Sequence, residues 1–160
     1  MKKVFLMGAV ALSVSLVSCN KEEKTEKILN GAWTVTGLDG TVVDSDQGQT
    51  DTYKLKNGSG DITLDRETAT GSMNVMYEID IPFGGSTFTV KDTMAGTITL
   101  WNNSDKDVSM TLKDASGSTQ NIGFEIVTNE KTAQDWKFTQ KNVDGTATTD
   151  VTYTMKLTKK

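Results

Sequence analysis

Cys19 is the only cysteine in this 160-residue sequence, which contains no histidine. A thiolate can act as a nucleophile or a metal ligand, but the usual catalytic pairs and the usual zinc, copper and haem sites also need histidine or further cysteines. A single cysteine cannot form an intramolecular disulfide either. The chemistry that remains for Cys19 is covalent modification of its sulfur, and the neighbouring residues indicate which one.

The residues before Cys19 have the three parts of a secretory signal. Lys2 and Lys3 form a positively charged start, and an apolar run covers residues 4–17. This run is too short to cross a bilayer as a helix of the mature protein. The alternative is an ordinary signal peptide that is followed by a cysteine by chance.

The segment Leu16-Val17-Ser18-Cys19 resembles the lipobox of bacterial lipoproteins. The resemblance implies that a diacylglycerol is attached to the Cys19 sulfur, that residues 1–18 are removed as the signal peptide, and that the new amino terminus gains another acyl chain, such as palmitate. Each buried methylene contributes about 0.8 kcal/mol, so two or more chains anchor a protein stably where one does not. We therefore expect a lipoprotein that is anchored in the outer membrane by its lipids.

The residues after Cys19 also carry a resemblance. Lys21, Glu22 and Glu23 resemble the tag that directs lipoproteins of the Bacteroidota across the outer membrane to the cell surface. The alternative is a solvated tether over residues 19–30, which would leave the protein facing the periplasm. The domain that follows covers residues 31–160.

Composition excludes several classes of function. Without residues 1–18, which carry two lysines and no acidic residue, the net charge changes from −4 to −6. An acidic domain is repelled by phosphate backbones, so we expect no nucleic-acid partner. Carboxylate chemistry remains open to Glu67, Glu78 and Glu125, but no spacing makes two of them face each other. We expect no catalytic residues, no metal site and no cofactor, and we interpret the acidic segment 44–51 as a solvated loop that lacks the calcium-loop pattern.

Asp92-Thr93-Met94 resembles the site of protein O-glycosylation in the Bacteroidota. The resemblance implies that Thr93 would carry the glycan. We expect Thr93 on an exposed loop between strands.

Apolar and polar residues alternate through much of the sequence after Gly31, as in strands with one buried face. The longest stripes are Met73 to Ile81 and Val151 to Leu157. Glycine-containing pairs that favour tight turns separate the stripes: Asp39-Gly40, Asn57-Gly58, Gly84-Gly85, Ser116-Gly117 and Asp144-Gly145. The pattern predicts an all-β domain of about eight to ten strands, either an antiparallel up-and-down barrel or a β-sandwich.

The start of the domain, Leu29-Asn30-Gly31-Ala32-Trp33, resembles the opening of lipocalin-like domains in Bacteroidota lipoproteins. The resemblance implies that Gly31 permits a tight entry into the first strand and that Trp33 closes one barrel end beneath a basic side chain, here Lys156 or Lys159. The segment from Trp33 to Gly40 is also similar to the META domain of secreted bacterial proteins.

These observations lead to two expectations for function. The first is a lipid-anchored, lipocalin-like barrel that binds a small apolar ligand or presents a binding surface without catalysis. The second is an accessory protein that docks on an outer-membrane complex or a host protein. Trp101 and Met76 fall on the polar sides of their strands and are candidate contact residues. The alternative for Trp101 is a side chain that covers a sheet end or a barrel mouth.

Overall fold

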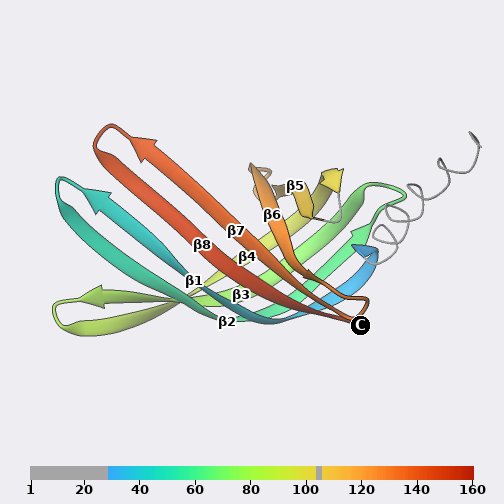
Figure 1. Cartoon of the computed structure of the whole chain (residues 1–160), viewed down its shortest axis with the longest axis horizontal. Helices are drawn as coiled ribbons and strands as arrows, with labels where there is room; N and C mark the ends of the chain where they lie inside the picture. The colour runs from blue at the N-terminus through green and yellow to red at the C-terminus, as the bar shows by residue number, and fades with distance from the viewer. Residues whose placement is uncertain (1–28, 104–105) are drawn as a thin grey trace, which may run out of the picture.

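The computed structural model describes residues 29–103 and 106–160, and within these ranges eight antiparallel strands form one closed barrel (Figure 1). Each strand pairs with the next, and β8 closes the barrel against β1. The prediction of an up-and-down barrel is confirmed, and the sandwich alternative is wrong. The strands are β1 (Gly31–Asp46), β2 (Gln49–Asp65), β3 (Thr70–Phe83), β4 (Ser86–Asn103), β5 (Asp107–Lys113), β6 (Thr119–Asn129), β7 (Ala133–Asp144) and β8 (Ala147–Lys159).

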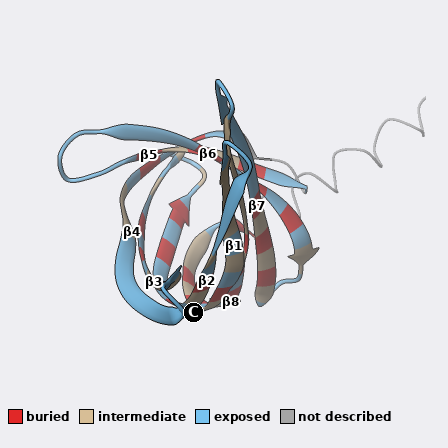
Figure 2. Cartoon of the chain, turned by 90° about the vertical axis from the view of Figure 1, so that its left-hand side faces the viewer, coloured by how far each residue is buried: buried red, intermediate tan, exposed pale blue. Residues whose placement is uncertain are grey.

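The alternating stripes produce the core. Successive side chains of a strand point to opposite faces, so each apolar stripe fills the barrel interior while its polar partners face solvent. In β8, for example, Tyr153, Met155 and Leu157 are buried. Figure 2 shows this as buried bands that alternate with exposed ones along the strands.

Two glycine pairs that predict turns lie within strands instead. Asn57-Gly58 forms a bulge in β2, where Asn57 has φ 55°, and Asp39-Gly40 lies inside β1. A Cβ on Gly58 would overlap Leu38, and one on Gly40 would overlap Tyr153 and the Thr152 carbonyl. These glycines therefore let neighbouring backbones approach closely. Because neither pair forms a turn, the strands are longer and their number, eight, lies at the lower end of the predicted range.

The strands differ greatly in length, which gives the barrel two unlike ends. We call the end that contains Gly31 and Lys159 the closed end. At this end β6 pairs with β7, residues 125–129 with residues 134–137. Beyond these pairs the two strands separate, and the hairpins β1–β2, β3–β4 and β7–β8 extend past β5 and β6 (Figure 1). We call this second end the mouth.

Candidate ligand-binding site

Trp33 fills the closed end of the barrel. Its side chain is fully buried, and its Nε1 donates a hydrogen bond to the carbonyl oxygen of Leu29 at 3.1 Å. The Nζ of Lys159 lies 5.3 Å from the centroid of the Trp33 ring, within the range of a cation–π interaction. Lys159 thus occupies the place that the resemblance assigns to Lys156 or Lys159.

Gly31 begins β1 with a φ of 115°, a conformation that residues with a Cβ rarely adopt. The space around it is not the restriction, because a Cβ there would lie 3.6 Å from Cε of Lys159. Backbone conformation is therefore the reason for glycine at this entry, directly beneath the lysine that covers Trp33.

An aromatic cluster of Phe124, Trp136, Phe138 and Tyr153 crosses the middle of the barrel. The ring centroid of Phe124 lies 5.4 Å from that of Trp136 and 6.0 Å from that of Phe138. Phe138 and Tyr153 are stacked at 4.9 Å. These rings come from β6, β7 and β8, and they fill the interior at the level where β6 and β7 separate.

The buried polar group in this cluster is fully bonded. Gln134 is the single buried polar side chain among residues 29–101 and 106–160. Its Oε1 accepts a 2.7 Å hydrogen bond from Nε1 of Trp136, and its Nε2 donates to Oδ1 of Asn129 at 3.0 Å. This satisfied pair fixes the Trp136 ring, because a buried indole N–H without a partner would be costly.

A cavity of about 220 Å³ lies on the mouth side of the aromatic cluster. Most of its lining side chains are apolar and come from seven of the eight strands. The lining residues are Leu38, Val42, Leu55, Tyr77, Ile79, Met94, Gln120, Ile122, Phe138, Gln140, Val151 and Tyr153. This arrangement, an apolar concavity with a few polar groups, is typical of small-molecule sites.

Two tyrosine hydroxyls are among the polar groups of the cavity. The Tyr77 hydroxyl donates a 2.9 Å hydrogen bond to Oδ2 of Asp92, and the Tyr153 hydroxyl contacts the sulfur of Met94 at 3.8 Å. Burial, with the Asp92 carboxylate as a further cause, raises the pKa of Tyr77 to about 12. Burial also raises the pKa of Tyr153. Both hydroxyls therefore remain neutral hydrogen-bonding groups at physiological pH.

The volume of the cavity restricts its ligand. Pockets for drug-sized molecules usually enclose roughly 300–1,000 Å³, and this one is smaller. It fits a small molecule or one end of a longer one. Since its apolar lining supplies no charged partner, an apolar group is the occupant that this chemistry favours.

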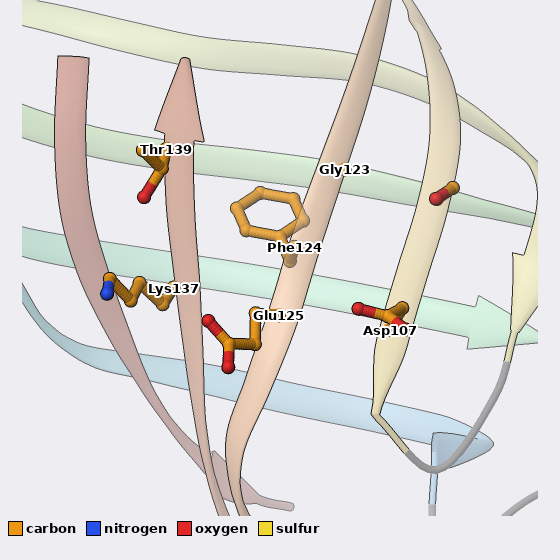
Figure 3. Close-up of a pocket in the computed structure, with 7 residues that line it drawn as sticks. Asp107, Gly123, Phe124, Glu125, Lys137 and Thr139 are labelled. Carbon is orange, nitrogen blue, oxygen red and sulfur yellow. The ribbon is translucent and has the colours of Figure 1, made fainter. Parts of the chain in front are cut away.

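A second hollow, of about 260 Å³, lies on the outer wall of the barrel over β5, β6 and β7 (Figure 3). Asp107 is opposite Glu125 in the β5–β6 ladder, and Glu125 is opposite Lys137 in the β6–β7 ladder. Gly123 has no side chain to cover this wall, and the Phe124 ring lies in the space between β6 and β7. The hollow is open and mostly polar, which suits solvent or a weak surface contact better than an enclosed ligand.

Thr93 is exposed, as predicted, but the prediction of a loop is wrong. It lies within β4, opposite Met76 of β3, and its backbone N–H donates to Oδ1 of Asp92 at 2.7 Å. The physical reason is that β3 and β4 pair continuously up to their shared Gly84-Gly85 turn. Met76 and Trp101 are also exposed, and Trp101, at 62 % exposure, lies where the β4–β5 register shifts.

The acidic segment 44–51 is mostly strand and not a loop, with only a two-residue turn at Gln47 and Gly48 between β1 and β2. Asp44 and Asp51 face each other in the β1–β2 ladder, and Asp46 lies at the end of β1. In the part of the chain that the structure describes, no group of three or more acidic, histidine or cysteine side chains is placed to hold a metal ion.

Several expected residues lie outside the described ranges: Cys19, Lys21, Glu22, Glu23 and signal segment 1–18. Among the described residues, no helix has the length and apolarity that crossing a membrane would require. The lipid attachment and the surface tag therefore remain predictions from sequence.

The cavity contains residues that the sequence pattern did not single out. Gln140 is the clearest, because it continues the inward stripe of Trp136 and Phe138 at the next position but one. A polar residue at the next inward position after an apolar stripe indicates, from sequence alone, that solvent reaches the interior there. Gln120 precedes Ile122 in the same way on β6.

The sequence matches no protein-family model and has no significant match among curated proteins. The fold and the geometry of the cavity therefore carry the functional argument.

Proposed function

We propose that this protein is a non-catalytic, lipid-anchored, lipocalin-like lipoprotein whose barrel binds a small apolar ligand. The observation that carries the proposal is the apolar cavity between the aromatic cluster and the mouth. Its walls come from seven strands of a closed barrel, and the cavity is present without a ligand.

The anchor is the second part of the proposal. The lipobox resemblance at Cys19 supports attachment to the outer membrane, and Lys21, Glu22 and Glu23 support display on the cell surface, with the periplasmic face as the alternative. The described chain starts at the closed end, where Leu29 is buried beside Trp33. The described chain therefore enters the barrel opposite the mouth (Figure 1), and this supports a mouth that stays accessible when Cys19 is held at a membrane.

A second candidate function is that of an accessory subunit that binds another protein. Trp101 and Val127 favour it, because both are exposed apolar side chains on the outer wall. Each lies where a ladder register shifts, between Leu100 and Asn102 in β4 and between Ile126 and Thr128 in β6. Bulges re-aim side chains and recur at functional positions.

Native mass spectrometry tests the first function. Residues 20–160 contain every strand and the whole described core, so they are expressed without Cys19 and examined before and after organic extraction. We expect a co-purifying small molecule, or binding of the neutral probe N-phenylnaphthylamine after extraction.

A cavity-filling variant identifies the place of binding. Val151→Trp fills the cavity, whereas Val143→Trp adds the same bulk to the exposed face of the same hairpin. Loss of probe binding in the first and not in the second supports the proposal. Binding that is equal in both folded variants, or absent in the parent protein, contradicts it.

A further inference from the structure

The β3–β4 hairpin extends alone beyond the barrel. The ladder between β2 and β3 ends at Lys54 and Asp80, whereas β3 and β4 stay paired to Phe83 and Ser86. Figure 1 shows the tip of this hairpin diverging from the β1–β2 hairpin. Since β5 pairs with β4 only from Thr97 onward, the extension has no neighbouring strand at either edge among the described residues. The exposure of Phe83, Phe88 and Val90 shows that its mouth-side face is uncovered as well.

The uncovered face on the mouth side is apolar. Ile79, Ile81 and Phe83 of β3 point to this side, and Val90 and Phe88 lie opposite the first two on β4. Phe83 is 73 % exposed, Phe88 is 59 % exposed and Val90 is 46 % exposed. The rings of Phe83 and Phe88 contact each other, with centroids 6.1 Å apart. We call these five residues the hairpin strip.

The opposite face of the hairpin is polar and held in place. Oδ2 of Asp80 forms a 2.6 Å ion pair with Nζ of Lys56, and Oδ1 of Asp80 accepts a 2.7 Å hydrogen bond from Thr89. These contacts join the base of the hairpin to β2. They keep the polar face outward and the hairpin strip toward the mouth.

The hairpin strip continues the cavity. Ile79 lines the cavity, and the pairs Ile79–Val90 and Ile81–Phe88 lead from it to Phe83 at the tip. Antiparallel strands rise about 3.4 Å per residue, so the path from Ile79 to Phe83 is about 14 Å long. The cavity, which fits only a small group, is thus continuous with the apolar hairpin strip.

We propose that the hairpin strip is the second half of the ligand site and that it takes the outer part of a linear alkyl chain, whose inner end fills the cavity. This inference rests on the proposed function, and it specifies the ligand as a long-chain amphiphile. A compact ligand of the same volume would leave the strip exposed to water, whereas a linear chain removes its apolar area from water.

The size of the strip favours this occupant over a globular partner. A stable protein interface buries about 800 Å² on each side. Aromatic side chains supply about 150–250 Å² each. The two partly exposed rings and three aliphatic side chains of the strip therefore offer roughly half of the area that a stable interface buries on one partner.

The headgroup of the test ligand follows from the charge of the mouth. Asp44, Asp46 and Asp51 lie on the β1–β2 hairpin beside the mouth, and the net charge of the chain is negative. Uncharged headgroups therefore avoid repulsion, and octyl, decyl and dodecyl maltoside below their micelle-forming concentrations are suitable probes.

Isothermal titration of residues 20–160 with the three maltosides tests the inference. We expect affinity to rise from octyl to dodecyl maltoside. Phe83→Ser/Phe88→Ser should weaken dodecyl maltoside binding by about tenfold or more, since it removes apolar contact area, and should leave octyl maltoside binding nearly unchanged. Trp101→Ser/Val143→Ser is the matched control, because it removes exposed apolar side chains elsewhere and should have no effect.

Three outcomes would overturn the inference. The first is an affinity that does not depend on the length of the alkyl chain. The second is a hairpin variant, Phe83→Ser/Phe88→Ser, that binds dodecyl maltoside as tightly as the parent protein. The third is a hairpin variant that binds with unchanged affinity but elutes as a monomer on size-exclusion chromatography where the parent protein elutes as a dimer. In each case the proposed function would still stand if the parent protein binds octyl maltoside and Val151→Trp abolishes that binding. If no maltoside and no naphthylamine probe binds, the proposed function fails as well.

Discussion

The rings of Phe138 and Tyr153 are stacked across the β7–β8 ladder, with centroids 4.9 Å apart and planes inclined by 24°. Both rings line the cavity on one side and contact Phe124 on the other. This pair is therefore the floor of the cavity and separates it from the filled half of the barrel.

Removing one ring of this floor should deepen the cavity. Phe138→Ala should lower the free energy of unfolding by about 3–5 kcal/mol, the usual cost of a large-to-small change in a core. It should also let the barrel accept bulkier apolar probes. Urea unfolding measures the first effect and probe titration the second, with Phe138→Leu as the milder control. Unchanged probe selectivity in the folded alanine variant would contradict the role of Phe138 as the floor.

Lys159 should stabilise the closed end through its charge. Lys159→Gln should lower the free energy of unfolding by about 0.5–2 kcal/mol, because it removes the cation above the Trp33 ring. Lys159→Arg keeps a cation and should retain most of that stability. Thermal unfolding at matched salt compares the three proteins, and a glutamine variant as stable as the parent protein would exclude the interaction as a stabilising one.

Gly60 should be among the least replaceable residues of the sheet. It has φ 141°, and a Cβ there would overlap the carbonyl oxygen of Asn74. Gly60→Ala should cost more than about 2 kcal/mol of stability, since strain and overlap add. Gly85→Ala is the control, because φ is 81° there but the surrounding space is open, and it should cost about 1–2 kcal/mol. If denaturant unfolding shows the same loss of stability for Gly60→Ala and Gly85→Ala, the overlap at Gly60 does not contribute to the cost.

Alkaline pH should lower the free energy of unfolding through Tyr77. Burial raises the pKa of Tyr77 to about 12 from its ordinary value of 10.0, so the folded protein holds this proton more tightly than the unfolded chain. The corresponding stability is complete below pH 10 and is lost as the pH rises toward 12. Tyr77→Phe should show a smaller loss of stability over that interval. Tyrosinate absorbance during a pH titration checks the prediction, and an ordinary pKa for Tyr77 would contradict it.

Cys19 should decide where the protein fractionates. Cys19→Ser should move the full-length protein out of the membrane fraction and leave an unprocessed, larger polypeptide, because no acyl chain can be attached to serine by a thioether. Cell fractionation and intact mass measure both effects. A serine variant that stays in the membrane fraction at unchanged size would disprove the anchor.

The strand stripes explain why so much of the fold was predictable. Trp33 and Val35, or Tyr153 and Met155, alternate with polar residues, and this local pattern fixes which face of each strand is buried. Glycine pairs were less informative. Gly84-Gly85 makes a turn, whereas Asn57-Gly58 makes a bulge, and both pairs carry the same local preference for positive φ.

The order of residue types alone predicts an all-β domain with inward apolar stripes and a lipid anchor at Cys19. The strand number, the separation of β6 from β7, the floor formed by Phe138 and Tyr153, and the cavity between that floor and the mouth depend on how the strands pack together. Local alternation specifies the face that a side chain occupies. Whether side chains from seven strands fill the interior or leave a space depends on where those strands meet, and residues distant in sequence set that jointly.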